Sequence, residues 1–94
     1  MRNSFPLVAL AAAILMLSAA ASLASRTAAD ACASRLAPDA KLVYGAVIGS
    51  VAQGTDLVEL VRSKTRGLVM AGKLDRAQAQ TAAQAAGACL KQAL

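Results

Sequence analysis

Residues 75–94 read DRAQAQTAAQAAGACLKQAL. Asp75, followed by Gln78 three positions later, has the spacing of a helix-capping box. After Asp75, small apolar residues recur at helical spacing, and alanine favours the helical state. The pattern predicts a helix that continues to the C-terminus, with an apolar face made of Ala79, Ala82, Ala83, Ala86, Leu90 and Ala93. Because alanine buries little apolar area, this helix must lie very close to its neighbours.

Proline and glycine divide the preceding residues into three more segments with helical periodicity. These run from Thr27 to Leu36, from Pro38 to about Gln53, and from Thr55 or Asp56 to about Gly72. Pro38 disfavours a helical Ala37 and suits the first turn of the helix that follows it. Asp56 and Glu59 repeat the capping-box spacing. The third segment is expected to bury a broad apolar face, made of Leu57, Val58, Leu60, Val61, Thr65, Leu68 and Val69.

Residues 42–51 leave a strand open as the alternative, because this unbroken run of apolar and small residues contains several β-branched side chains. We prefer a helix, since apolar residues recur at helical spacing at Leu42, Val43, Ala46, Val47 and Val51. In that helix, Gly45 and Gly49 would form a Gly-x-x-x-Gly pair, a spacing that lets two helices approach closely. We expect the approaching helix to be the alanine-rich one, and dimerisation is the alternative.

The N-terminus has the order of an export signal. A basic start at Arg2 precedes an apolar run over 5–17, and small residues follow as far as Ala24. Cleavage after Ala24 would remove residues 1–24 as the signal peptide. Residues 25–94 would remain as one small helical domain, which is expected to be periplasmic or secreted. The alternative is an inner-membrane anchor through residues 5–24, which are about long enough to span a bilayer. Cleavage is preferred, because no basic cluster follows directly to stop transfer.

Cys32 and Cys89 are the two cysteines of the chain. In an oxidising compartment they predict one disulfide, and two buried, unpaired thiols are the alternative. The bridge would close most of the mature chain into one loop. By lowering the entropy of the unfolded chain, it would stabilise the folded state by up to about 4 kcal/mol. A chain this short and this rich in alanine has a thin core, and small scaffolds of this kind usually need a covalent staple or a partner subunit.

The chain carries a formal net charge of +5 at pH 7. Its cations gather around the end of the third predicted helix, where Arg62, Arg66 and Lys73 would follow one helical stripe. A cationic ridge of this kind attracts anionic surfaces. The candidate contact residues are Arg62, Arg66, Lys73 and Arg76. The alternative is an ordinary solvated face, with Arg62 paired to Glu59.

No constellation for catalysis or for cofactor binding is recognisable in the sequence. The chain has no histidine, so a serine or cysteine nucleophile would lack its usual base. Two cysteines without histidine cannot supply the four ligands of structural zinc. The glycines do not form a phosphate-binding loop, and the aromatic side chains that stack on nucleic-acid bases are missing. We therefore expect no enzyme, no metal, no cofactor and no nucleic-acid partner.

The block Lys64–Arg76, followed by the segment Ala85–Lys91, resembles short uncharacterised exported proteins of alphaproteobacteria. The resemblance covers most of the mature chain. It implies a periplasmic helical protein with paired cysteines and brings no activity with it.

These features predict an all-α fold, a small bundle of three to four short helices stapled by one disulfide. The expected function is non-enzymatic binding of another protein or of an envelope component, and a homodimer is left open. The alternatives are a small periplasmic acid-stress chaperone and a cationic binder of anionic envelope surfaces. Against the chaperone, a chain with five acidic residues and no histidine has few groups that titrate between neutral and acidic pH.

Overall fold

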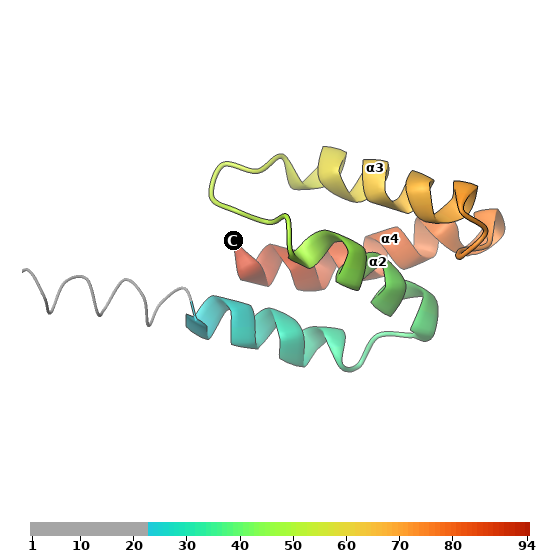
Figure 1. Cartoon of the computed structure of the whole chain (residues 1–94). Coiled ribbons are helices and arrows are strands. Elements are labelled where there is room, and N and C mark those ends of the chain that lie inside the picture. The colour runs from blue at the N-terminus through green and yellow to red at the C-terminus, as the bar shows by residue number, and fades with distance from the viewer. Residues whose placement is uncertain (1–22) are drawn as a thin grey trace, which may run out of the picture.

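Residues 23–94 are the part of the chain described by the structure, a computed structural model. Residues 23–33, the first helical segment, are followed by α2, α3, α4 and a terminal 3-10 helix, η1 (Figure 1). The bounds of these elements are Pro38–Ile48 for α2, Leu57–Met70 for α3, Arg76–Leu90 for α4 and Lys91–Ala93 for η1. No strand occurs within the described residues, so the all-α prediction is confirmed and the strand alternative for 42–51 is excluded.

Three of the predicted helix starts are confirmed, and the first helix is already formed at residue 23, before its predicted start at Thr27. Pro38 opens α2. The Asp56 carboxylate accepts a hydrogen bond from the Glu59 N–H at 3.2 Å, and the Asp75 carboxylate accepts one from the Ala77 N–H at 3.3 Å. Each bond satisfies an N–H that helix geometry leaves without a partner.

Glycine sets the end of α3. Gly72 has a φ of 75°, the left-handed conformation that glycine adopts without steric cost. Its N–H donates to the Val69 carbonyl at 3.1 Å, while the Lys73 N–H donates to the Leu68 carbonyl at 2.9 Å. This pair of bonds is a Schellman motif, which ends the helix where the sequence predicted.

The first two helical segments end earlier than predicted, and α4 ends at Leu90, where the 3-10 helix η1 replaces the α-helix predicted to reach the C-terminus. The first helical segment stops at residue 33 rather than at Leu36, because the chain tightens there: the Arg35 N–H donates to the Cys32 carbonyl and the Leu36 N–H to the Ala33 carbonyl, each at 3.1 Å. α2 stops at Ile48 rather than near Gln53. In the connection after α2, the Thr55 hydroxyl accepts from the Ala52 N–H at 2.9 Å, a local bond that competes with a continued helix.

α2 and α4 form the middle of the molecule, with the first helical segment on one side and α3 on the other (Figure 1). The largest side chains that are fully buried are Val43 and Val47 of α2 and Cys89 and Leu90 of α4. Around them the core consists mostly of alanine, so it is as thin as the composition predicted. The buried alanines are Ala29, Ala33, Ala40, Ala82 and Ala86.

Gly45 and Gly49 do not make the close approach predicted for them. Both are exposed, and a Cβ built on either glycine would have no heavy atom within 4 Å. The expectation that they pack against the alanine-rich helix is wrong, because α2 turns Val43 and Val47 toward the core and Gly45 lies on its other side. Packing across a homodimer stays a prediction.

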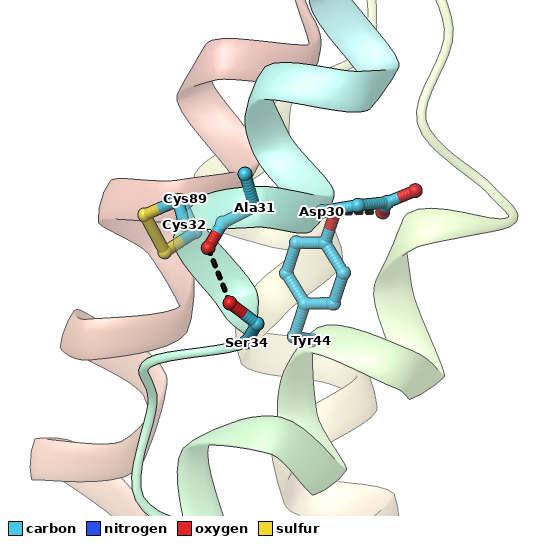
Figure 2. The surroundings of a disulfide bond; sticks show 6 residues. All are labelled: Asp30, Ala31, Cys32, Ser34, Tyr44 and Cys89. Atoms are coloured by element: carbon cyan, nitrogen blue, oxygen red, sulfur yellow. Dashed lines mark hydrogen bonds between the residues drawn. A yellow bond between two sulfur atoms is a disulfide. The ribbon is translucent and has the colours of Figure 1, made fainter.

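The Cys32–Cys89 disulfide is present, with the two Cα atoms 5.4 Å apart. It joins the first helical segment to α4 (Figure 2). On the other side of the segment, the Tyr44 hydroxyl of α2 donates a hydrogen bond to the Asp30 carboxylate at 2.6 Å (Figure 2). The side chains of this segment that are buried are only Ala29 and Ala33. Its attachment therefore depends heavily on these two links.

Residues 1–22 lie outside the described part of the chain. They include nearly all of the predicted signal peptide, residues 1–24, and of the alternative anchor, residues 5–24. In the described part, no helix combines the length and the apolar character needed to cross a membrane.

Candidate functional site

A groove of about 1080 Å³ runs between α3 and α4. From α3 it is lined by apolar residues, namely Leu57, Val58, Val61, Val69 and Met70. From α4 it is lined by small residues, namely Ala79, Ala83, Gly87 and Ala88. Two packed helices have axes about 8–10 Å apart, and alanine and glycine are too short to fill the space at the open edge of such a pair. The alanine-rich composition of α4 thus leaves this edge hollow.

The apolar side of α3 is less buried than the sequence predicted. Val61 and Thr65 are buried, while Leu57, Leu60, Leu68 and Val69 are only partly covered. Val58 is 64% exposed and Met70 is 81% exposed. The amphipathic pattern identified the apolar side correctly. The prediction that all of it is buried is wrong, because no described element lies over the open edge of the groove.

Three of the four predicted contact residues line this groove, namely Arg62, Arg66 and Arg76. Lys73 does not, because the turn at Gly72 ends α3 before the helical stripe reaches it. The groove adds Lys91, which the sequence analysis did not single out. Lys91 lies about four helical turns after Arg76, so the spacing could have placed the two on one side of α4.

The charge around the groove is positive and largely unbalanced. The Glu59 carboxylate accepts a hydrogen bond from Arg62 at 2.7 Å, as the spacing predicted, which offsets that one cation. Within residues 23–94 the other salt bridge is Arg26–Asp30, so Arg66, Arg76 and Lys91 have no acidic partner there. None of the residues that line the groove is acidic. The site therefore combines an apolar floor with a cationic rim.

Thr65 is the polar residue buried in this region. Its side chain is 8% exposed, and among the described residues its hydroxyl oxygen is buried without a hydrogen-bond partner. Burying an unpaired hydroxyl lowers stability. Thr65 also lines the groove, so the floor of the site holds a polar group that the fold itself leaves unsatisfied.

A second polar feature, the Tyr44–Asp30 pair, lies away from the groove on the first helical segment. Burial of the tyrosine, together with the neighbouring Asp30 carboxylate, raises the pKa of Tyr44 to about 12. The hydrogen bond from Tyr44, with a smaller contribution from Arg26, lowers the pKa of Asp30. Both shifts favour the state in which the neutral phenol donates to the ionised carboxylate.

Within residues 23–94, no three cysteine, acidic or histidine side chains come together in a way that could hold a metal ion.

The arrangement of the groove suits the binding of a partner that is apolar on one side and negatively charged at its edges.

No protein-family model, curated protein or solved structure matches this chain. The resemblance to exported alphaproteobacterial proteins stays a prediction, and the residues of the groove alone support the functional interpretation.

Proposed function

We propose that the protein is a non-enzymatic binding module of the extracytoplasmic compartment, which holds an apolar segment of another protein in the groove between α3 and α4. The observation that carries the proposal is the exposure of Val58 and Met70 beside a groove that the chain's own side chains leave unfilled. Contiguous apolar surface that stays exposed in a folded protein commonly marks an interaction site.

The proposed location rests on the signal-like N-terminus and the disulfide. Disulfides persist in oxidising compartments and are rare in the cytosol. The Cys32–Cys89 bond holds the first helical segment against a thin, alanine-rich core, so the folded form depends on a compartment in which this bond can close.

Site-specific photo-crosslinking in cells tests the function. A benzophenone side chain is placed at Val58 or at Met70, both exposed in the groove, and at Leu42 as the control. Leu42 is a suitable control because it is an apolar side chain of α2, 43% exposed, that does not line the groove. We expect adducts of discrete size from positions 58 and 70 and none from position 42. Equal labelling from all three positions, or none from any, would refute the proposal.

A further inference from the structure

We propose that the segment held in the groove is an amphipathic α-helix with acidic residues along the edges of its apolar face. This inference rests on the proposed function and names the chemistry of the partner. Three independent features of the groove support it: its dimensions, its charge and the nature of its floor.

The dimensions fit a helix. An α-helix with its side chains is about 10–12 Å wide, so a volume of about 1080 Å³ holds about two turns of one. The lining residues repeat along both walls, from Leu57 to Met70 on α3 and from Arg76 to Ala88 on α4, with Lys91 of η1 just beyond. A helix lying lengthwise between two helices would therefore meet apolar side chains at every turn, as helix-in-groove complexes do.

The charge selects an acidic helix. Arg66, Arg76 and Lys91 line the groove without an acidic partner in the described residues, and no acidic residue lines it beside them. A carboxylate on the edge of the bound helix would meet these cations. A second copy of this chain placed face to face across the groove would instead oppose cation to cation, which is unfavourable. A flat lipid surface could reach the rim but would leave the concave floor empty.

The floor is adapted to take in side chains. Met70 is flexible and polarisable, which suits it to packing against varied apolar partners. Gly87 lies inside α4, where glycine is unfavourable for the helix, and a Cβ built on it would have no heavy atom within 4 Å. Packing within the chain therefore does not require a glycine there. The missing side chain leaves room in the groove, where the partner would lie.

Peptide binding tests the inference on the exported protein, purified with its disulfide intact. The probe is a labelled helical peptide of about 14 residues, the length of α3, with leucine on one face and glutamate at both edges of that face. A second peptide carries lysine in place of glutamate, and a third scrambles the acidic sequence. We expect the acidic peptide alone to bind, and its affinity to fall by at least fivefold between about 0.05 M and about 0.5 M salt because the rim charges become screened.

Matched variants place the peptide in the groove. Gly87→Leu fills the groove and should abolish binding, whereas Gly67→Leu makes the same change in α3 outside the groove and should leave binding unchanged. Arg66→Glu should weaken binding of the acidic peptide by about five- to tenfold, and Lys41→Glu on α2 should change it less than twofold. Circular dichroism checks the fold of each variant. If Gly87→Leu does not fold, Gly87→Ala replaces it as the variant that adds a side chain to the groove.

Several results would overturn the inference. If the lysine peptide binds as well as the acidic one and Gly87→Leu removes both, the groove is a binding site and only the acidic partner is wrong. If anionic vesicles bind the protein and displace the peptide, the cationic rim serves a membrane surface instead. If no peptide binds and positions 58 and 70 give no crosslinked adducts, the proposed function fails together with the inference.

Discussion

Tyr44 is the residue whose chemistry reports most directly on the attachment of the first helical segment. It is the only tyrosine, and the chain has no tryptophan, so near-ultraviolet absorbance of a tyrosinate can come from Tyr44 alone. Its pKa is raised, so its contribution to stability is present below about pH 10 and is lost as the pH rises toward about 12. The pKa of Asp30 is lowered, so its contribution is present above about pH 4 and is lost as the pH falls through the lowered pKa.

The first prediction concerns this pair. Asp30→Asn removes the carboxylate that favours the neutral phenol, so the pKa of Tyr44 should fall below about 12 while staying above about 10, because burial still raises it. Absorbance titration of the tyrosinate measures the change. Asp75→Asn, which keeps a side chain able to cap α4, is the control and should leave the titration unchanged. An identical titration in wild type and Asp30→Asn would show that the pair does not form.

At the level of the elements, two glycines near the end of α3 have opposite roles. Gly67 lies inside the helix, exposed, and a Cβ built on it would have no heavy atom within 4 Å. Gly72 lies just after the helix with a φ of 75°, which an alanine adopts only with strain. One glycine weakens the helix and the other ends it.

The second prediction is that the two alanine substitutions change stability in opposite directions. Gly67→Ala should raise the free energy of unfolding by about 1 kcal/mol, since alanine is the better helix former. Gly72→Ala should lower it by about 1–2 kcal/mol, since alanine is disfavoured in the left-handed conformation. Urea unfolding of the disulfide-bonded protein measures both. Changes of the same sign in the two variants would contradict the assignment of the Schellman motif.

The third prediction concerns the first helical segment. Reducing the Cys32–Cys89 bond, which spans 57 residues of sequence, should lower the free energy of unfolding by about 4 kcal/mol through loop-closure entropy. Amide hydrogen exchange should accelerate most over residues 23–33, because the buried side chains of this segment are alanines, and less in α4, which packs against both α2 and α3. Protein incubated without reductant is the control. Uniform acceleration across all helices would contradict a separately held segment.

Local sequence signals predicted most element starts and the staple. Pro38, Asp56 and Asp75 act within their own first turns, so their positions could be predicted without knowledge of the rest of the fold. The end of α2 depends on contacts that form only in the folded chain. The same holds for the position of Gly45 on the exposed side of α2, away from any neighbouring helix. The periodicity of α3 identified its apolar side, but whether that side is covered depends on the size of side chains on α4. This is why the groove was missed although most of its cations were predicted.

At the level of the whole molecule, the disulfide and the groove lie on different sides of the α2–α4 core. Figure 1 shows the first helical segment on one side of α2 and α4, and α3 on the other. The disulfide joins the first helical segment to α4, whereas the groove lies between α3 and α4. The two features therefore support separate claims, one about where the protein folds and one about what it binds.

The fourth prediction tests the claim about folding and location. Protein recovered from the extracytoplasmic fraction should have an intact mass that begins at Ser25 and is two hydrogen atoms lighter than the dithiol form, because signal peptidase has acted and Cys32–Cys89 has closed. Mass spectrometry under non-reducing conditions, with a reduced sample as the control, identifies both the first residue and the state of the disulfide. A mass that retains residues 1–24 would instead indicate an N-terminal anchor.

The most direct test of the groove as the binding site is amide chemical-shift mapping of the disulfide-bonded protein, from Ser25 onward, with the acidic amphipathic peptide. The fifth prediction is that perturbed amides cluster at the groove, at Val58, Met70 and Gly87, while Gly45 on the exposed side of α2 and residues 25–33 stay unchanged. Perturbations centred on α2 or on the first helical segment, with the amides of the groove unaffected, would contradict the account.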